Sequence, residues 1–313
     1  MSTLQQRCQT NIHKSLALAR ELIRILDCID SLGVEALPYK GLALAEAAYG
    51  DMALRQSGDI DILILAKDLP RIREAMRDLG YLPHLPMAPA EERAYLLSGY
   101  ECAFDGAAGR HLLELQWALQ PRFYAVDFDM NGLFRRAVAA TVAGRCVKTP
   151  SPEDLLLILS LHAAKHVWGR LIWLCDIARI VGLPNLRWDW IQGDAKALGV
   201  IRILRVTLLL ANRLLGVAIP AAFDTTEDDA ALGLADEMSE QIPRGTYYNV
   251  ESVAYFRLMM RLRERPADRL RFLRRLVFTP GPGEWQTVRL PAALFPLYHV
   301  VRLSRLAARL ARA

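Results

Sequence analysis

The sequence predicts an α+β protein in which a small mixed sheet is followed by an all-helical domain. Short apolar runs bounded by glycines and polar turns, which are typical of strands, are concentrated in the first half of the chain. A long N-terminal segment repeats apolar residues at helical spacing. From Ser151 onward the helical pattern continues almost to the C-terminus. We therefore place a mixed α/β domain at 1–149 and a helical domain at 150–313.

Each element of the first domain has a local reason. Leu22 and Leu26 belong to the apolar face of one helix, which we expect over residues 4–31 and which ends near Gly33. An apolar run at 34–39 that precedes a glycine suits a strand. By the same criteria we expect helices at 42–49 and 69–79, and strands at 60–65, 100–104, 111–117 and 145–148.

The helical domain opens with a clear start signal. In Ser151-Pro152-Glu153-Asp154, a serine at the N-cap precedes a proline at the first position and two acids in the first turn. Residues 155–182 are the most apolar of the chain, yet histidines and charged residues interrupt them. A membrane span needs about 20 apolar residues with few or no charges. We therefore expect a buried helix pair here and no membrane span.

The cysteines and the N-terminus indicate a reducing compartment. Five cysteines are dispersed along the chain without a close pair: Cys8, Cys28, Cys102, Cys146 and Cys175. Such an odd, scattered set argues against a disulfide framework and against a zinc site. We expect buried free thiols. The first residues are polar and no apolar stretch follows them, so we expect no signal peptide and a cytoplasmic protein.

The most informative segment is Gly58-Asp59-Ile60-Asp61-Ile62-Leu63-Ile64. Side chains alternate along a strand, so Asp59 and Asp61 point to one face and the isoleucines to the other. Two carboxylates on one face raise each other's pKa unless a cation lies between them. Mg²⁺ takes hard oxygen ligands, commonly one or two protein carboxylates plus substrate phosphates. The pair is therefore a candidate magnesium site. The alternative, a solvated strand end, is disfavoured by the apolar strand that follows.

A second element, Tyr39-Lys40-Gly41, lies between an expected strand and an expected helix. A glycine there lets backbone N–H groups approach a phosphate, and the helix that follows directs its positive dipole end at the same place. Lys40 adds positive charge. Arg55 and Ser57 flank the acidic pair and are candidate phosphate contacts, with a solvated loop as the alternative.

Together these segments reveal a resemblance that extends along almost the whole chain. The sequence resembles the uncharacterised nucleotidyltransferase family of the polymerase-β-like superfamily. The resemblance rests on these segments: Lys40-Gly41-Leu42-Ala43-Leu44-Ala45, Tyr49-Gly50-Asp51, Leu54-Arg55, Ser57-Gly58-Asp59-Ile60-Asp61, Glu114-Leu115-Gln116-Trp117, Pro152-Glu153-Asp154-Leu155-Leu156, Leu161-His162-Ala163-Ala164-Lys165-His166 and Trp173-Leu174-Cys175-Asp176-Ile177-Ala178. Near the C-terminus, Glu284-Trp285 and Leu290-Pro291, followed by Tyr298 and Arg302, are similar too.

The resemblance implies a polymerase-β-like nucleotidyltransferase domain and a two-metal nucleotidyl transfer. Asp59 and Asp61 are then the ligands of Mg²⁺, for which Mn²⁺ can substitute, and the co-substrate is a nucleoside triphosphate, with ATP favoured. Alternation along the strand 111–117 puts Glu114 on one face with Gln116, so Glu114 is a third carboxylate, either a metal ligand or the general base. Gln116 departs from the family, which usually has histidine there. Glutamine does not titrate, so any acid–base role at this position is lost or moved.

A polar cluster is expected inside the apolar helix pair. His162, Lys165 and His166 lie at i, i+3 and i+4 and therefore on one face of one helix, with Asp176 on the next helix. Two histidines at this spacing suit zinc, but no third ligand follows at a suggestive distance. We expect Lys165 to contact the nucleotide phosphates, with His162 or His166 positioned by Asp176. A purely structural network is the alternative.

The acceptor of the nucleotidyl group stays open at this level. The resemblance implies a small molecule or a modified peptide natural product, such as a lasso peptide. An alternative is transfer to tRNA or another RNA, as in toxin-like relatives; its support is the arginine-rich run 257–275 in a chain of net charge +5. We expect that run to form the solvated faces of two helices. A third possibility is a non-catalytic module that binds nucleotide or peptide, which the three intact carboxylates disfavour.

Overall fold

The computed structural model describes residues 3–106, 111–221, 223, 228–242, 244, 252–280 and 282–310. The chain forms two compact units. The first combines Met1–Ala88, Tyr100–Ala118 and Asp129–Ser151, and the second combines Pro89–Gly99, Leu119–Phe128 and Pro152–Ala313. This division differs from the single cut expected after residue 149. Two segments from the first half of the chain belong with the helices, where, for example, Arg275 pairs with Asp127.

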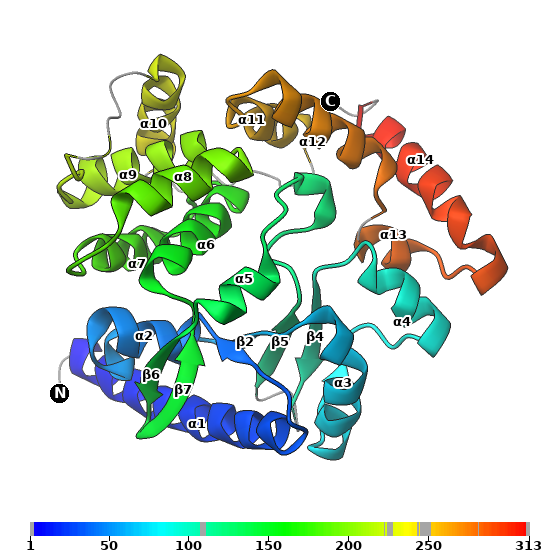
Figure 1. Cartoon of the computed structure of the whole chain (residues 1–313), viewed down its shortest axis with the longest axis horizontal. Helices are drawn as coiled ribbons and strands as arrows, with labels where there is room; N and C mark the ends of the chain where they lie inside the picture. Colours follow the sequence, from blue (N-terminus) through cyan, green and yellow to red (C-terminus); the bar gives the residue numbers. More distant parts are fainter. Residues whose placement is uncertain are drawn as a thin grey trace. The chain divides into compact units, whose positions relative to one another are not determined.

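A five-stranded mixed sheet forms the centre of the first unit, which confirms the predicted α+β fold class (Figure 1). Its order is β1-β2-β5-β4-β3, and only the β2–β5 pair is parallel. The strands are β1 (Leu37–Pro38), β2 (Asp59–Leu63), β3 (Leu82–Pro83), β4 (Glu101–Asp105) and β5 (Leu112–Gln116). A separate hairpin joins β6 (Val138–Val142) to β7 (Arg145–Thr149) through Ala143 and Gly144, both with positive φ, as a two-residue hairpin turn requires.

The two faces of the sheet differ in chemistry. Ile60, Ile62, Leu113 and Leu115 are at most 4% exposed, so one face of β2 and β5 is fully apolar. Because side chains alternate, the carboxylates of the same strands share the opposite face. The alternation therefore separates a structural face of the sheet from a polar one.

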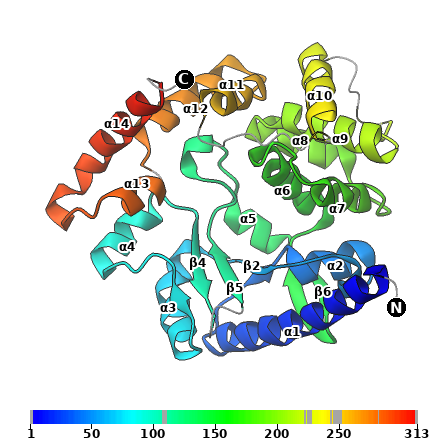
Figure 2. The ribbon, with the colours of Figure 1, turned by 180° about the vertical axis from the view of Figure 1, so that it is seen from behind.

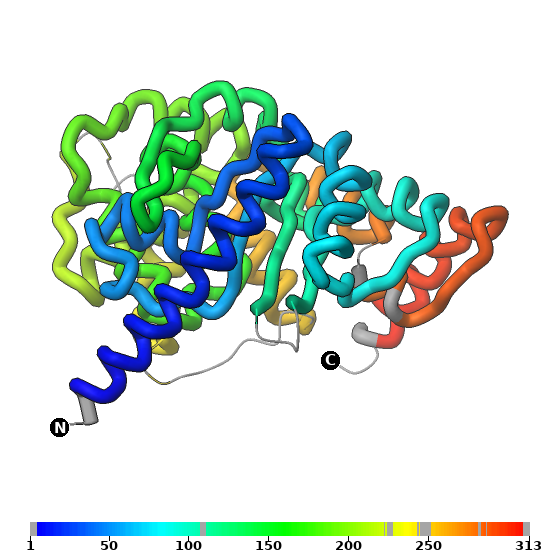
Figure 3. Tube along the Cα trace, turned by 90° about the horizontal axis from the view of Figure 1, so that it is seen from below, coloured from blue at the N-terminus to red at the C-terminus, as the bar shows by residue number. Residues whose placement is uncertain are grey.

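Four helices accompany the sheet: α1 (Thr3–Ser31), α2 (Gly41–Tyr49), α3 (Leu69–Asp78) and α5 (Met130–Arg135). Figure 3 shows α1, in blue, as one long uninterrupted helix that leads away from the N-terminus. It contacts β2, and its Ile25 and Ile29 are fully buried. Two short 3₁₀ turns, Met52–Leu54 and Ala66–Asp68, flank β2. The helices thus cover apolar surface of the first unit, and a 3₁₀ turn lies at each end of β2.

The second unit is helical throughout the residues that the structure describes. Its elements are α4 (Pro89–Leu96), η4 (Arg122–Tyr124), α6 (Pro152–Lys165), α7 (Leu171–Val181), α8 (Trp188–Leu198), α9 (Ile201–Leu215), α10 (Asp229–Gln241), α11 (Val253–Arg261), α12 (Pro266–Phe278), α13 (Pro282–Thr287), η5 (Ala292–Leu297) and α14 (Tyr298–Leu310). Helix α6 packs against α7, α8 and α9, and Trp168 Nε1 donates to Thr207 Oγ1 at 3.0 Å. Within the described part of the chain, no helix is both long and apolar enough to cross a bilayer.

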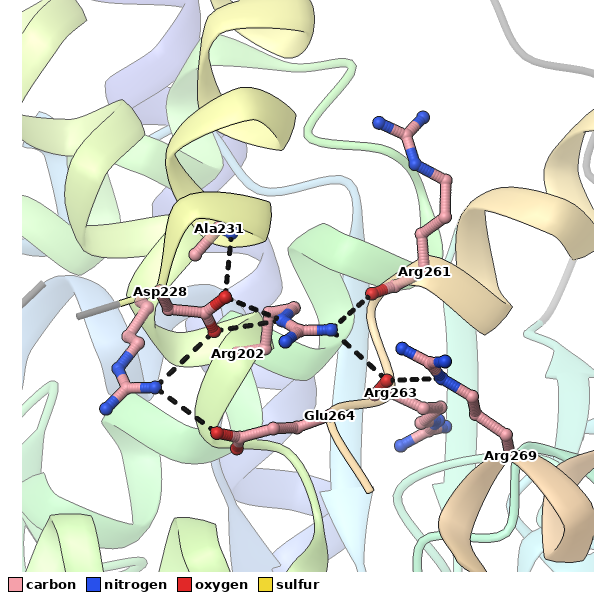
Figure 4. A network of polar contacts seen from close by, with 8 residues as sticks. Arg202, Asp228, Ala231, Arg261, Arg263, Glu264 and Arg269 are labelled. Atoms are coloured by element: carbon pink, nitrogen blue, oxygen red, sulfur yellow. Dashed lines mark hydrogen bonds and ion pairs between the residues drawn. The ribbon is translucent and has the colours of Figure 1, made fainter. Parts of the chain in front are cut away.

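An arginine–aspartate network ties three helical segments of this unit together (Figure 4). Arg202 Nε lies 2.9 Å from Asp228 Oδ2, and Arg202 Nη1 donates to the backbone oxygens of Arg261 at 3.0 Å and Arg263 at 3.3 Å. Asp228 also caps α10 by accepting from the Ala231 N–H at 3.1 Å. Buried charges that are paired and hydrogen-bonded in this way fix the geometry of their surroundings.

The five cysteines are free, as expected, but the expected burial is wrong for four of them. Cys8 and Cys146 are exposed, Cys28 and Cys175 are half-buried, and Cys102 alone is buried. Cys146 is exposed because it lies in the short hairpin of β6 and β7, outside the main sheet.

Candidate active site

The three carboxylates predicted from the sequence meet on the polar face of the sheet. In the parallel pair of β2 and β5, Asp61 is the register partner of Glu114, and Asp59 is that of Leu112. Because register partners lie side by side and residues two apart share a face, Asp59, Asp61 and Glu114 belong to one surface. Neighbouring parallel strands therefore bring together acids that lie 53 positions apart in the chain (114 minus 61).

Lys40 forms an ion pair with one of these acids. Its Nζ lies 3.0 Å from Asp61 Oδ1, and both side chains are buried, at 11% and 3% exposure. Burial works to lower the pKa of Lys40, but the carboxylate of Asp61 and the hydroxyl of Tyr39 outweigh it, and the pKa of Lys40 is raised. Lys40 therefore carries a proton at every physiological pH and partly neutralises the acidic face.

One lysine does not neutralise three acids. Burial, followed by the charges of Asp61 and Glu101, raises the pKa of Glu114 to about 7. Burial, followed by the charge of Asp61, also raises the pKa of Asp59 above its ordinary value. The face thus holds more negative charge than its surroundings stabilise, which is the condition under which a bound cation is favoured.

Gln116 connects the acidic face to its neighbours. The Tyr39 hydroxyl donates to Gln116 Oε1, and Gln116 Nε2 donates to Glu114 Oε2 at 3.1 Å and to Glu101 Oε2 at 3.3 Å. Gln116 is 3% exposed, so this amide is held in a buried position. The residue that departs from the usual histidine therefore orients Glu114. Glu101 carries no signal in the sequence, and the contact of Tyr39 with Gln116 carries none either, because only the order of the strands brings these residues beside Gln116.

The backbone conformation of Gly41 explains why a glycine follows Lys40. Its φ is +54°, and a Cβ built on it would lie 3.3 Å from the backbone oxygen of Asp59. Only glycine combines this left-handed backbone with so close an approach. The start of α2 consequently lies directly against the first residue of β2, and its N-cap, Lys40, makes no side-chain hydrogen bond to the helix backbone.

Arg55 is buried in the loop that precedes β2. It is 8% exposed, and its Nη1 donates to Ser57 Oγ at 3.2 Å and to the Gln56 oxygen at 3.3 Å. The charge of Arg55 also acts on Asp59, whose pKa it works to lower. The solvated-loop alternative therefore does not hold for Arg55, whereas Ser57 is half-buried between two exposed neighbours.

A family model described as uncharacterised nucleotidyltransferase matches residues 1–216 of the 313 residues. The chain belongs to this family. The match includes all of the first unit and the helical segment that begins with α6. None of the curated protein sequences is similar enough to count as a relative.

Three solved structures are similar to this nucleotidyltransferase at low sequence identity. ANT(2'')-Ia in complex with adenylyl-2''-tobramycin has 15% identity and a TM-score of 0.40, with 58% of this chain and 97% of that chain covered. The solution structure of the antibiotic-resistance factor ANT(2'')-Ia has 18% identity and a TM-score of 0.31, with 69% and 96% covered. An antigenic nucleotidyltransferase-like protein from Paracoccidioides brasiliensis has 17% identity and a TM-score of 0.35, with 59% and 86% covered.

Nucleotidyltransferases generally use a divalent metal, and the donor set here fits one. Asp59, Asp61 and Glu114 offer hard carboxylate oxygens, the ligands that Mg²⁺ prefers. Burial first, and then the neighbouring carboxylates, raise the pKa values of Asp59 and Glu114. Among the described residues, however, no three His, Cys, Asp or Glu side chains are already gathered as a metal cluster. A cation at this face has to compete with Lys40 for Asp61.

The residues predicted in the helix pair lie in the second unit. The ring of Trp173 in α7 contacts His162 edge-on and His166 at a tilt, with ring centroids 5.1 and 5.3 Å apart, respectively. Asp176 is fully buried, and the backbone oxygen of Lys165 accepts a hydrogen bond from Tyr255. His162, His166 and Trp173 thus form an aromatic cluster, whereas the participation of the Lys165 and Asp176 side chains in it stays a prediction. Their contact with nucleotide phosphates stays a prediction.

Proposed function

We propose that this nucleotidyltransferase transfers a nucleotidyl group, adenylyl in the preferred case, from a nucleoside triphosphate to a hydroxyl or phosphate of a small molecule or modified peptide. One observation carries the proposal. Asp61 and Glu114 are register partners on a strand face of β2 and β5, and burial raises the pKa values of Asp59 and Glu114 on that face. A module that only binds nucleotide has no use for acids held in this unfavourable arrangement.

The residues have separate tasks in this scheme. Asp59, Asp61 and Glu114 would hold one or two Mg²⁺ ions, with Mn²⁺ as a substitute, and the metal would supply positive charge to neutralise the phosphates. Glu114 is either a metal ligand or the base that takes the proton of the acceptor hydroxyl. Gln116 fixes the orientation of Glu114 by its hydrogen bond at 3.1 Å.

Phosphate binding falls to the groups around the start of α2. The backbone N–H groups of the first turn of α2 follow Gly41. Arg55 and Ser57 precede Asp59 in the loop before β2. Lys40 supplies positive charge to the same place. Lys165 stays a further candidate phosphate contact, with His162 or His166 positioned by Asp176.

The transfer itself is a single displacement. The acceptor oxygen attacks the α-phosphorus and forms a new P–O bond. The bond from that phosphorus to the bridging oxygen of the β-phosphate breaks, and pyrophosphate leaves with the electron pair. The acceptor proton moves to the base. Catalysis of this kind depends on positioning and on electrostatic stabilisation of the transferring group.

The arrangement of the arginine-rich run disfavours RNA as the acceptor. Arg263 is 2% exposed, and burial lowers its pKa to about 10. Other arginines of the run are used in contacts within the protein: Arg261 with Glu237, Arg265 with Asp268, Arg269 with the Arg263 oxygen, and Arg275 with Asp127. The expected solvated faces are confirmed for Arg257, Arg261, Arg265, Arg271 and Arg274, which are exposed, whereas Arg263 is buried and Arg269 and Arg275 are half-buried. We place the reaction in the cytoplasm, with a peptide natural product such as a lasso peptide as one acceptor class.

The test is a transfer assay with each of the four labelled nucleoside triphosphates, Mg²⁺ and fractionated small-molecule and peptide extracts. We expect label from ATP in a small acceptor, together with release of pyrophosphate. Asp61→Asn serves as the inactive control. Label that appears in RNA would reject the proposed acceptor class. Pyrophosphate release that is equal in the wild type and the control would reject the proposed site.

A further inference from the structure

The second unit contains a cavity of about 620 Å³, and none of its lining residues belongs to the proposed transfer site. Residues of α4, η4, α12, α13, η5 and α14 line it, and Figure 2 shows α4, α12, α13 and α14 close together in the helical unit. Most of its walls lie after residue 216, where the family match ends. Small-molecule sites usually enclose about 300–1,000 Å³, so the volume suits a small ligand.

One wall of this cavity is a cluster of aromatic rings. The Trp285 ring lies 4.1 Å from the Tyr298 ring and 5.3 Å from the Phe295 ring, measured between centroids. All three residues line the cavity. Such a wall offers a flat apolar surface for a planar ligand.

Buried ion pairs hold the aromatic wall in place. Glu284, which precedes Trp285, is 1% exposed and pairs with Arg302 at 3.3 Å and Arg305 at 3.1 Å. The Tyr298 hydroxyl donates to the Val288 oxygen at 3.0 Å and accepts from the Leu290 N–H at 3.2 Å. The Glu-Trp, Leu-Pro, Tyr and Arg motif near the C-terminus therefore builds this wall, and a wall that is fixed before binding loses little freedom when a ligand arrives.

The remaining lining combines neutral residues with three arginines and one histidine. Arg122, Arg274, Arg275 and His299 line the cavity, and none of its described lining residues is Asp or Glu. Arg275 is engaged with Asp127 at 2.6 and 2.7 Å. Arg122 uses Nη1 for the Leu97 oxygen at 2.7 Å. Arg274 is exposed on the same helix as Arg275, so its guanidinium faces solvent at the rim. Guanidinium groups are well suited to bind carboxylate, sulfonate or phosphate oxygens.

Two polar atoms of the wall have no hydrogen-bond partner among the described atoms. They are Trp285 Nε1 and Ser98 Oγ, and both are buried. Buried polar atoms are nearly always satisfied, so unpaired ones in a cavity wall indicate that a partner is missing. The acceptor oxygens of an anionic ligand are partners of the right kind.

We propose that this cavity binds a small anionic ligand with an aromatic body, whose ring lies on the Trp285 wall and whose acidic group meets Arg274. A carboxylate, sulfonate or phosphate serves equally in this arrangement. The proposal does not depend on the transfer reaction, because its site lies in the helical unit and its test is binding without nucleotide or metal.

The experiment is a fluorescence titration of the full chain with anilinonaphthalene sulfonate, an aromatic anion, and with its neutral analogue N-phenylnaphthylamine. We expect saturable binding of the anion to one site and much weaker binding of the neutral analogue. Phenyl phosphate and benzoate are then added as competitors, and whichever displaces the probe more effectively identifies the preferred acidic group. No saturable binding, or equal binding of the anion and the neutral analogue, overturns the proposal.

Two pairs of variants locate the site. Arg274→Glu reverses a rim charge, and we expect about tenfold weaker binding of the anion. Arg271→Glu makes the same charge change at an exposed position of α12 that does not line the cavity, and we expect it to bind the anion as the wild type does. Leu97→Glu and Leu270→Glu repeat the comparison with an added acid, since these leucines are 70% and 69% exposed and only Leu97 lines the cavity. Equal losses within either pair would show nonspecific charge attraction and reject the site.

Discussion

Lys40 Nζ lies 3.0 Å from Asp61 Oδ1, and this contact distinguishes two acids that the sequence presents as equivalent. Asp61 has a buried cationic partner. Asp59 has a raised pKa, because burial and the charge of Asp61 both disfavour its ionised form. Removal of the two charges should therefore have the same effect on catalysis and opposite effects on stability.

Asp59→Asn and Asp61→Asn are each expected to lower turnover by about a hundredfold or more, because each removes a ligand for the cation. Without metal, Asp59→Asn should raise the free energy of unfolding slightly. Asp61→Asn should lower it by about 1–3 kcal/mol, since Lys40 keeps a buried charge without its partner. Urea denaturation in EDTA measures both effects. Stability changes of the same sign in the two variants would contradict the pairing of Lys40 with Asp61.

Glu114 should make the stability of the metal-free protein dependent on pH. Its pKa rises from the ordinary 4.5 to about 7 in the folded protein, mainly through burial. The folded state therefore holds this proton more tightly than the unfolded state. The stabilisation is complete below about pH 4.5 and is lost as the pH rises through about 7, by on the order of 2 kcal/mol.

Glu114→Gln is the direct check of this dependence. In EDTA, the variant should match the wild type near pH 5 and exceed it in free energy of unfolding at pH 8. Leu112→Gln, at the neighbouring position on the same face of β5, is the control, and its curve should run parallel to that of the wild type. If the Glu114→Gln curve is also parallel, the assigned environment of Glu114 is incorrect.

Mg²⁺ and ATP together should raise the melting temperature more than the sum of their separate effects. A ligand stabilises a protein only to the extent that it binds the native state. The triphosphate alone meets three carboxylates, which repel it until a cation intervenes. Thermal melts with Mg²⁺, ATP, both, and ATP in EDTA measure this, with Asp61→Asn as the control that should lose the joint effect. Equal shifts with and without EDTA would place the nucleotide elsewhere.

The carboxylates could be predicted from the sequence because they depend on local rules. The acidic pair precedes an apolar strand, and alternation alone fixes its face. The hydrogen bonds of Gln116 could not be predicted from the sequence. They require the strand order β1-β2-β5-β4, which brings Tyr39 and Glu101 to either side of Gln116. The short β3 and the strand β6 were missed as well. β3 consists of two residues, and four of the five residues of β6 are exposed or half-buried, so neither has the apolar pattern of a buried strand.

Gln116 is expected to act on the reaction through Glu114. Gln116→Leu removes the amide that holds Glu114 and Glu101, and kcat should fall about 10–100-fold with little change in KM for ATP. Gln116→His retains one donor and one acceptor, so its loss should be smaller. Tyr39→Phe removes the donor on the other side of the same amide.

A double-mutant cycle separates this positioning role from a loss of packing. If Tyr39, Gln116 and Glu114 act as one network, the effects of Tyr39→Phe and Gln116→Leu on kcat should be clearly less than additive. Fully additive effects, or losses that appear only in the melting temperature, would show that Gln116 merely fills space.

Asp228 should be a main determinant of the stability of the helical unit. Burial works to raise its pKa, but the hydrogen bonds from Arg202 and from the Ala231 N–H outweigh this, and the pKa is lowered. Its contribution to stability is therefore present above about pH 4 and is lost as the pH falls through the lowered folded value.

Asp228→Asn retains the helix cap, since asparagine caps well, but removes the charge that faces Arg202. The free energy of unfolding at pH 7 should drop by about 3 kcal/mol, because Arg202 keeps a buried charge without a partner. Asp229→Asn, at the adjacent exposed position, should cost about 0.5 kcal/mol or less. Urea denaturation of the two variants at pH 7 and pH 3 distinguishes them. The gap between them should narrow at pH 3, and equal losses at pH 7 would refute the role of the Arg202–Asp228 pair.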